Sequence, residues 1–407
     1  MKTETPCPLC SAPDTAVFLQ RQGVPVHQNL LLGDAEAARA ISRGDLEMAV
    51  CDSCGFVFNQ AFDPAKLSYG GDYDNDQSGS PRFLSHMDSL AHLLLMEKGV
   101  RDSRIVEVGC GQGQFLQLLV DNPHNNTAMG FDPSYTGPDE ALEGRMRFVA
   151  QNFDETAVGV EAGVVVCRHV IEHVGDPVDF LRGIRGAVGE GARIYIETPD
   201  VDWILENRVV WDFFFEHCSL FSSGSLATAL ARSGFEMTET RSVFGGQYLF
   251  MEAKAVPVTH DIAPVCGPTC ALALAFGEHE QNLLQGWKKT VLEYQRNGNV
   301  GLWGAGAKGA TLANLVDPEA SLLSCVVDIN SNKCGKYVAG TGHPITDLAG
   351  ATERGVKALI LMNPEYREEN ELLLKTAGSD ICLVRHGKTQ VCERVGRLRG
   401  RPRIGMP

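Results

Sequence analysis

Residues 105–115 read Ile-Val-Glu-Val-Gly-Cys-Gly-Gln-Gly-Gln-Phe, and this stretch decides the fold of the chain. A short β-branched run ends at an acid, Glu107, and three alternate glycines follow it. Those glycines are Gly109, Gly111 and Gly113. Glycines in such a place permit a tight turn from strand to helix and let a ligand approach the backbone closely. The spacing is G-x-G-x-G, which differs from the G-x-G-x-x-G of dinucleotide binders.

With this turn the sequence resembles the class I S-adenosylmethionine-dependent methyltransferases. A second acid, Asp132 in Gly-Phe-Asp-Pro, ends the next expected strand, where a ribose diol would lie. A further expected strand, residues 164–169, ends in Arg-His. The alternative is a structural turn in an unrelated α/β domain. The resemblance implies a cofactor site composed of Glu107, Gly109, Gly111, Gly113, Phe115, Asp132, Pro133, Asn152, Arg168 and His169.

Strand and helix patterns alternate from residue 105 to about residue 255, which fits a doubly wound parallel sheet in an α/β fold. The expected strands are 105–108, 128–131, 164–168 and 193–197. Ligands of such sheets lie outside the carboxyl ends of the strands. The glycine turn, Asp132 and the residues 167–169 would all lie at that edge.

Length, charge and cysteine content limit the class of protein. A chain of 407 residues predicts two or three domains. The net charge of −15 argues against a protein that binds nucleic-acid backbones. No apolar run reaches membrane-spanning length and no signal peptide is recognisable, so we expect a soluble cytoplasmic protein. Thirteen cysteines, four of them in CxxC pairs, suit reduced thiols and a metal.

The first segment contains two CxxC pairs, which are the usual source of a tetrahedral four-thiolate zinc site. The four thiols are Cys7, Cys10, Cys51 and Cys54. The wide separation of the pairs requires an insertion, which includes a helix-like stretch at 34–40. Substitution of one thiolate by His27 is a minor variant, and two coincidental pairs are the alternative. The pattern predicts a structural zinc ion.

A polar, glycine-rich stretch at 69–81 separates the cysteine pairs from the glycine turn, and it contains Tyr69, Tyr73 and Ser80. Loops of this kind often carry binding groups, although a plain linker is the alternative. Two acid–histidine pairs follow later, Glu172-His173 and Glu216-His217. Histidine is readily poised as a general base near neutral pH, and a carboxylate partner fixes its tautomer. The alternative for each histidine is a hydrogen-bonded residue of the core.

From about residue 257 the composition changes to a linker rich in proline and glycine, and a helix follows. Residues 304–309 then read Gly-Ala-Gly-Ala-Lys-Gly, a G-x-G-x-x-G turn, with Asp328 about twenty residues further on. This pattern indicates a nicotinamide cofactor, but Lys308 would equally suit a phosphate. The arginines of residues 394–403 form a basic tail, which we expect to be solvated.

Taken over nearly its full length, the chain resembles the sugar C-methyltransferases of deoxysugar biosynthesis. The resemblance rests on the four cysteines, residues 73–80, Glu216-His217, residues 304–309 with Asp328 and Lys333, and residues 335–345. It implies a zinc module at 1–67, an S-adenosylmethionine domain at 68–256, a linker and helix at 257–290, and a Rossmann-like substrate-binding domain at 291–407. In that family the last domain helps to enclose a nucleotide-linked sugar instead of a redox cofactor.

The resemblance also implies roles for individual residues. His217 would be the base with Glu216 beside it, and His173 and Tyr73 would contact the keto sugar. Tyr69, Ser80, Lys308 and Asp328 would bind the substrate. The chain departs from the family at Phe214, where a tyrosine is common. This departure leaves open an O-methyltransferase that acts on a sugar or another small metabolite. Two alternatives of other classes also stay open: an NAD-dependent reductase built on the turn at 304–309, and a non-catalytic zinc-stabilised binding module.

Overall fold

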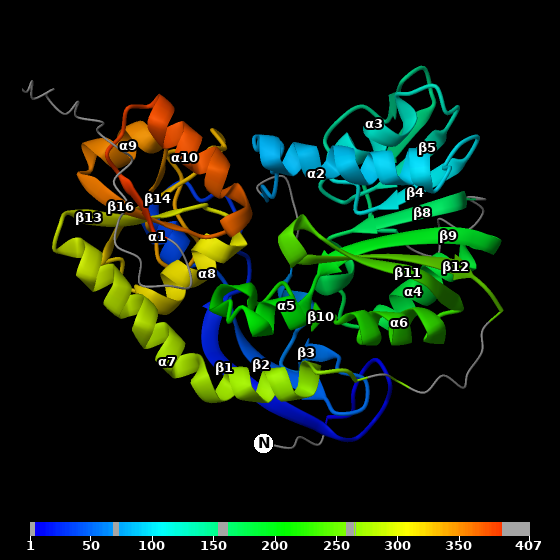
Figure 1. Ribbon diagram of the computed structural model, residues 1–407, viewed down its shortest axis with the longest axis horizontal. Helices are drawn as coiled ribbons and strands as arrows, with labels where there is room; N and C mark the ends of the chain where they lie inside the picture. Colours follow the sequence, from blue (N-terminus) through cyan, green and yellow to red (C-terminus); the bar gives the residue numbers. More distant parts are fainter. Residues whose placement is uncertain (1–4, 68–72, 154–161, 258–263, 265, 385–407) are drawn as a thin grey trace, which may run out of the picture.

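Strand β4 (Arg104–Val108) lies in the interior of an eight-stranded sheet in the computed structural model, which describes residues 5–67, 73–153, 162–257, 264 and 266–384 (Figure 1). Helices cover both faces of this sheet. Ile105 is buried with helices α2 and α3 on one face, whereas Val106 is buried with α4 and α6 on the other. The helices are α2 (Pro81–His92), α3 (Gln114–Val120), α4 (Pro177–Gly186) and α6 (Ser223–Arg232).

The strand order of this central sheet is β11-β12-β9-β8-β4-β5-β7-β6. The strands other than β4 are β5 (Thr127–Phe131), β6 (Glu140–Ala141), β7 (Met146–Val149), β8 (Ala162–Arg168), β9 (Val188–Pro199), β11 (Phe235–Val243) and β12 (Tyr248–Ala255). All four strands expected from the sequence lie within β4, β5, β8 and β9. Their side chains are buried on both faces, which is why they read as near-continuous apolar runs.

The four expected strands pair in parallel, as predicted, but the sheet as a whole is not parallel, because β12 runs antiparallel to both β9 and β11. The short β6 is also antiparallel to its neighbour β7. Only the four residues 244–247 join β11 to β12, whereas a parallel connection needs a dozen residues or more. The chain therefore returns as a hairpin, and β12 inserts between β11 and β9. The sheet is mixed.

The N-terminal residues form a second sheet, in the order β1-β2-β3-β10. Its strands are β1 (Thr15–Pro25), β2 (Arg43–Cys51), β3 (Val57–Asn59) and β10 (Ser219–Leu220). Helix α1 (Ala35–Arg39) lies in the insertion where a helix was expected. The fourth strand comes from the chain beyond residue 67, so the first 67 residues do not complete this sheet alone.

The C-terminal residues form a third sheet, in which all five strands are parallel, in the order β15-β14-β13-β16-β17. These strands are β13 (Asn299–Trp303), β14 (Leu323–Val327), β15 (Ile345–Thr346), β16 (Val356–Leu361) and β17 (Cys382–Val384). The accompanying helices are α8 (Ala307–Val316), α9 (Leu348–Glu353) and α10 (Arg367–Thr376). The basic tail at 394–403 lies outside the described residues.

Helix α7 (Thr269–Gln295) connects the central and C-terminal sheets and packs against strands β1 and β2 of the N-terminal sheet (Figure 1). It extends five residues beyond the boundary expected at 290. Its buried side chains Phe276 and Trp287 join one apolar core with Phe18 of β1 and Val300 of β13. The N-terminal and C-terminal sheets are therefore packed through a shared core. No helix in the described part of the chain is long and apolar enough to cross a membrane.

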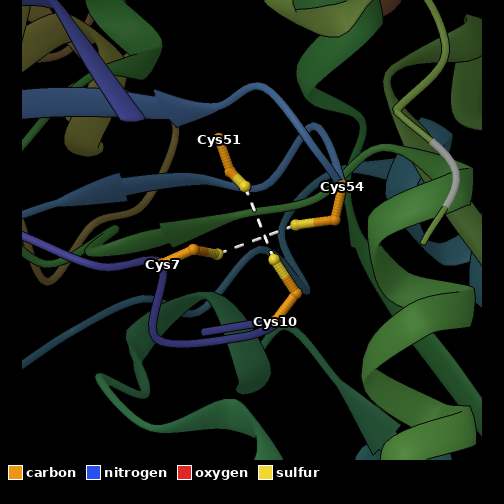
Figure 2. Close-up of side chains that lie close together, drawn as sticks. All are labelled: Cys7, Cys10, Cys51 and Cys54. Carbon is orange, nitrogen blue, oxygen red and sulfur yellow. Dashed lines mark hydrogen bonds between the residues drawn. The ribbon is translucent and has the colours of Figure 1, made fainter. Parts of the chain in front are cut away.

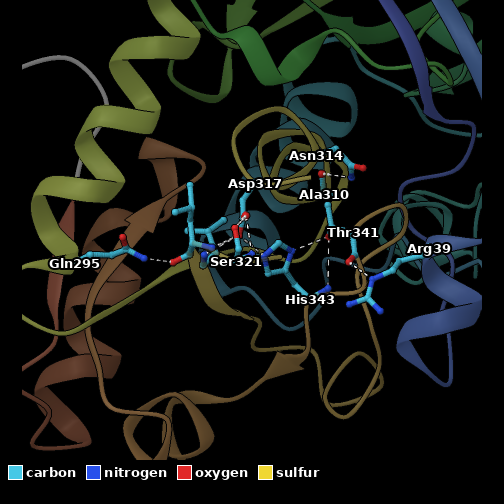
Figure 3. Close-up of polar contacts among 10 residues, drawn as sticks. Arg39, Gln295, Ala310, Asn314, Asp317, Ser321, Thr341 and His343 are labelled. Atoms are coloured by element: carbon cyan, nitrogen blue, oxygen red, sulfur yellow. Dashed lines mark hydrogen bonds and ion pairs between the residues drawn. The ribbon is translucent and has the colours of Figure 1, made fainter. Parts of the chain in front are cut away.

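A buried polar chain stabilises the C-terminal sheet (Figure 3). His343 contacts Asp317 through Nε2 at 2.9 Å and Thr341 through Nδ1 at 2.7 Å. Asp317 also accepts the backbone N–H groups of residues 321–323, and Arg39 donates to the carbonyl of Thr341. The residues resemble a nucleophile–histidine–acid triad. The hydroxyl is fully buried, however, so the triad serves structure.

We expect the free energy of unfolding to fall as the pH is lowered from 6.5 towards 5, partly because of His343. Burial lowers the pKa of this imidazole, although Asp317 opposes that effect. A group whose pKa is lower in the folded state binds protons preferentially in the unfolded state, so acid destabilises the fold. Urea titrations at several pH values should show this slope. The slope should be smaller in His343→Gln, and an equal slope would exclude His343 as a contributor.

Candidate active site

The glycine turn joins β4 to α3 in a backbone conformation that favours glycine. The φ angles of Gly109, Gly111 and Gly113 are +74°, +53° and +81°. A Cβ atom at Gly109 would lie 2.1 Å from Val170, whereas one at Gly111 would meet no atom within 4 Å. Asp132 accepts the N–H of Gly111 through Oδ2 at 2.8 Å. There is therefore no room for a side chain at Gly109, whereas the space beside Gly111 is open, so a ligand could approach the backbone there.

Two buried charged groups beside this turn keep polar atoms without a hydrogen-bond partner among the described residues. They are Glu107 at Oε2 and Arg168 at Nη2. Burial raises the pKa of Glu107 to about 8, although Arg168 opposes the rise. The Arg168 guanidinium lies 4.2 Å from the centre of the Phe115 ring. Such unsatisfied buried groups are rare in native proteins, and they fit a polar ligand at the turn.

Glu197, near the end of β9, lies beside one arginine and two histidine side chains. Its carboxylate accepts from Arg168 Nε at 2.8 Å and lies 2.5 Å from His86 Nε2 and 3.5 Å from His169 Nε2. Burial alone would raise the pKa of Glu197, but Arg168 and the two histidines hold it below its usual range. Glu197 therefore stays ionised and fixes Arg168 with its carboxylate, while its backbone carbonyl accepts the backbone N–H of His169 at 2.8 Å.

A cleft opens between the central and C-terminal sheets. Seven residues predicted as site residues line it: Tyr73, Ser80, His169, His173, His217, Lys308 and Asp328. His169 Nε2 lies 3.5 Å from the Glu197 carboxylate, so His169 stands between the cleft and the group formed by Glu197 and Arg168. Of the remaining predicted cofactor residues, Pro133 and Asn152 are exposed. Tyr69 lies outside the described residues.

The centre of the cleft contains two histidines. The rings of His173 and His217 are 4.9 Å apart and nearly perpendicular, and the Phe214 ring lies 4.0 Å from that of His217. Burial lowers the pKa of both imidazoles, and for His217 the neighbouring His173 lowers it further. Both imidazoles are therefore neutral at pH 7. His217 Nδ1 is itself buried, and it has no hydrogen-bond partner among the described residues.

The carboxylate grouped with these histidines is Glu172, whose side chain forms a cluster with His173 and His217. Glu216, expected beside His217, is fully buried, and its Oε2 accepts the backbone N–H of Gln28 at 2.9 Å. Neighbours in sequence point in different directions in an irregular segment. The Glu216 carboxylate therefore ties the segment of His217 to the N-terminal residues.

The second glycine turn lies on the opposite wall of the cleft. Asp328 accepts the N–H groups of Ala305 and Asn330, at 2.6 and 2.8 Å, with its two oxygens. Lys308 forms an ion pair with Asp212 at 2.7 Å. Both predicted substrate groups thus have partners in the protein. Lys333 also lines the cleft, and its Nζ donates a long 3.4 Å hydrogen bond to the Ala305 carbonyl.

The polar stretch after Tyr73 contacts the C-terminal residues. Tyr73 is linked to Asn29 by a 3.3 Å hydrogen bond to its hydroxyl. Ser80 Oγ caps helix α2 and donates to Glu369 Oε2 at 2.8 Å. Gln77 accepts the hydroxyl of Tyr366 at 2.8 Å. This stretch therefore forms a wall of the cleft and contacts both the N-terminal segment at Asn29 and the C-terminal residues.

The four predicted metal ligands converge on one point (Figure 2). Cys7 and Cys54 have their Sγ atoms 3.7 Å apart, and those of Cys10 and Cys51 are 3.5 Å apart. A tetrahedron with Zn–S bonds of about 2.3 Å has edges of about 3.8 Å. The sulfur positions therefore fit a four-thiolate zinc site, and His27 is not part of this cluster.

Several cleft residues were not singled out from the sequence. They are Asn29, Asp212, Gln247, Tyr248, Asn363 and Tyr366. Gln247 ends the connection between β11 and β12, and Tyr248 begins β12. No strand was expected from the sequence at this position. Asn29 and Asp212 belong to segments that are far apart in the sequence, and only the fold brings both of them to the cleft. No local pattern in the sequence marks these residues.

Two protein families match separate parts of the chain. Residues 82–240 match the family described as "Methyltransferase domain", and residues 271–375 match the "C-methyltransferase C-terminal domain". Residues 82–240 are thus a methyltransferase domain, the catalytic unit of an enzyme. The central sheet has the class I methyltransferase fold in its mixed form, and S-adenosylmethionine is the cofactor that goes with this fold.

The C-methyltransferase NovU of Streptomyces niveus is 26% identical over 269 residues, which cover 63% of this chain and 62% of that protein. The mitochondrial ubiquinone biosynthesis O-methyltransferase of Schizosaccharomyces pombe is 26% identical over 136 residues, 30% of this chain and 49% of that one. The chain thus spans about three fifths and about half of these relatives. The 1,6-didemethyltoxoflavin-N1-methyltransferase of Burkholderia thailandensis has a TM-score of 0.35 and 15% identity, covering 44% of this chain and 83% of that chain.

Proposed function

We propose that the protein is an S-adenosylmethionine-dependent C-methyltransferase whose acceptor is a nucleotide-linked keto sugar. The observation that carries the proposal is the position of His217. This imidazole is neutral and lines a cleft between the methyltransferase domain and the segment that matches a C-methyltransferase C-terminal domain. A buried neutral imidazole is suited to remove a proton from carbon beside a ketone.

S-adenosylmethionine supplies an electrophilic methyl group. The glycine turn and Asp132 hold it, with Arg168 and Glu107 at the base of the site. His217 takes the proton from the carbon beside the ketone. Tyr73 and His173 face the same cleft, where they donate hydrogen bonds to the ketone oxygen as negative charge develops on it. The residues 291–407 bind the nucleotide part of the acceptor, with Lys333 as the cation that has no carboxylate partner in the described structure.

The first experiment incubates the purified protein with S-adenosylmethionine and a panel of nucleotide-linked 4-keto sugars in deuterated water. Mass spectrometry then measures the gain of one methyl group and of deuterium at the carbon beside the ketone. Both gains support the proposal. A methyl group without exchangeable deuterium would favour the O-methyltransferase, in which His217 removes a hydroxyl proton. Phe214 favours that O-methyltransferase, since its ring places no hydroxyl beside His217.

The same preparation tests for a reductase and for a binding module. NADH binding that is lost in Gly306→Val would favour a reductase. Donor binding without transfer to any acceptor would favour a binding module. We also propose that zinc occupies the four-cysteine site in a structural role, since all four ligand positions are thiolates and none is left for a substrate.

Gly109→Ala is expected to raise the dissociation constant of S-adenosylmethionine about tenfold or more. Its Cβ would collide with Val170, which follows Arg168 and His169, so the cofactor wall must shift. Gly99→Ala is the matched control, because Gly99 also has a positive φ (+63°) but open space around it. Calorimetric titration measures both variants. Equal affinities in Gly109→Ala and the wild type would place the cofactor elsewhere.

A further inference from the structure

The segment 209–217 carries the groups that line the centre of the cleft, including Asp212, Phe214 and His217. Its regular structure is limited to the short 3-10 turn η5 (Val210–Asp212). A base must be held within a few tenths of an ångström of its working position. Contacts from outside must therefore fix the segment.

Arg21, on strand β1 of the N-terminal sheet, supplies two of these contacts. Its Nη1 donates to the carbonyl of Phe213 at 2.8 Å, and its Nη2 donates to that of Val210 at 2.7 Å. Its Nε donates to Glu280 of helix α7, also at 2.8 Å. The three nitrogens of one planar group therefore connect β1, the segment of His217 and α7.

Both members of the ion pair are buried, with exposed fractions of 8% for Arg21 and 5% for Glu280. A buried ion pair is costly to desolvate and is weak grounds for stability alone. A hydrophobic pair of the same size could pack here, but it would leave two carbonyl groups of the segment without donors. Only a guanidinium offers several donors in one rigid plane, which a lysine ammonium cannot match.

The N-terminal residues hold the other end of the segment as well. Glu216 Oε2 accepts the N–H of Gln28, which lies seven residues after Arg21. Asn59 of β3 donates its N–H to the carbonyl of Cys218 at 2.9 Å. The segment is thus fixed at 210, 213 and 216 and, directly after its end, at 218, while its cleft-facing groups at 214 and 217 take no part in these contacts.

We propose that Arg21 is a positioning residue for methyl transfer, which fixes the backbone that carries Phe214 and His217 without contacting the reactants. This inference rests on the proposed role of His217 as the base. A displacement of about 1 Å in a reacting group costs up to about a hundredfold in rate. Loss of the two carbonyl contacts is therefore expected to reduce kcat and leave the binding of S-adenosylmethionine unchanged.

The test compares Arg21→Lys with the matched control Arg43→Lys. Arg43 also donates to two backbone carbonyls, those of Gly23 and Gly340, but neither belongs to the segment 209–217. Arg21→Lys is expected to lower kcat about 10- to 100-fold with an unchanged dissociation constant for S-adenosylmethionine, and Arg43→Lys to keep the wild-type kcat. A wild-type kcat in Arg21→Lys would overturn the proposal.

Two further measurements separate positioning from folding and from the proposed function. Glu280→Gln breaks the ion pair but keeps both carbonyl contacts, so its kcat should exceed that of Arg21→Lys even if both variants melt at the same lowered temperature. The rate of modification of His217 by diethyl pyrocarbonate, followed by mass spectrometry, needs no acceptor. This rate should change in Arg21→Lys and not in Arg43→Lys. Equal rates in both variants would refute positioning even if the acceptor is not a keto sugar.

Discussion

His217→Asn is expected to reduce kcat about 10²- to 10⁴-fold, the range that a positioned general base contributes. Asparagine keeps a polar side chain of similar size but cannot take a proton at neutral pH. The dissociation constant of S-adenosylmethionine should stay near the wild-type value, because the proposed cofactor turn is made by other residues. Single-turnover methyl transfer and calorimetric titration measure the two quantities separately.

The control for this change is His279→Asn, since His279 is exposed on helix α7 and contacts only the carbonyl of Ala275 among the described residues. Its kcat should equal that of the wild type. A His217→Asn enzyme with more than about a tenth of the wild-type kcat would remove His217 as the base. The proton acceptor would then be sought at His173, the other imidazole in the cleft.

The pH profile gives an independent check on the same residue. Burial and His173 place the pKa of His217 well below the usual value for histidine. The base is therefore neutral and active above that lowered pKa, and it loses activity only when the pH falls through it. The acidic limb of kcat/KM should lie below pH 6.5. A limb above pH 6.5 would mean that another group controls the reaction.

The elements that could be predicted from the sequence are those set by local patterns. Strands β4, β5, β8 and β9 are short runs buried on both faces, so their apolar residues are nearly continuous. The turn at 109–113 needs glycine at three positive φ angles, which leaves a visible spacing. The two CxxC pairs are visible in the sequence, and their meeting could be predicted because a four-thiolate metal site needs four cysteines.

The parts that could not be predicted depend on contacts between distant segments. Glu216 and Glu172 each precede a histidine, but only Glu172 joins the histidine cluster. Glu216 points to Gln28 instead, on a segment that the sequence separates by 188 residues. The ion pair of Lys308 with Asp212 is also set by tertiary packing, and it leaves no local signal.

Cys54→Ser is expected to lower both the bound zinc and the free energy of unfolding, the latter by about 4 kcal/mol or more. Loss of a structural metal belongs to the few changes that exceed the usual 0.5–3 kcal/mol of a point mutation. Zinc content by mass spectrometry and thermal melting measure the effect. Cys334→Ser is the control, because Cys334 lies outside the four-cysteine cluster. Equal melting temperatures in the two variants would exclude a structural metal.

The same variant should also lose methyl transfer, for a reason that lies in the order of the N-terminal sheet. Strand β3 begins three residues after Cys54, and it pairs with β10, which begins two residues after His217. When the cysteines no longer bind a metal, the start of β3 is no longer held in place. Strand β10 then loses β3, its only partner in the described sheet. The glycine turn proposed to bind S-adenosylmethionine follows β4, which lies in a different sheet from β3 and β10, so the affinity for S-adenosylmethionine should fall less than kcat. A parallel fall in both would instead mean that the whole domain unfolds.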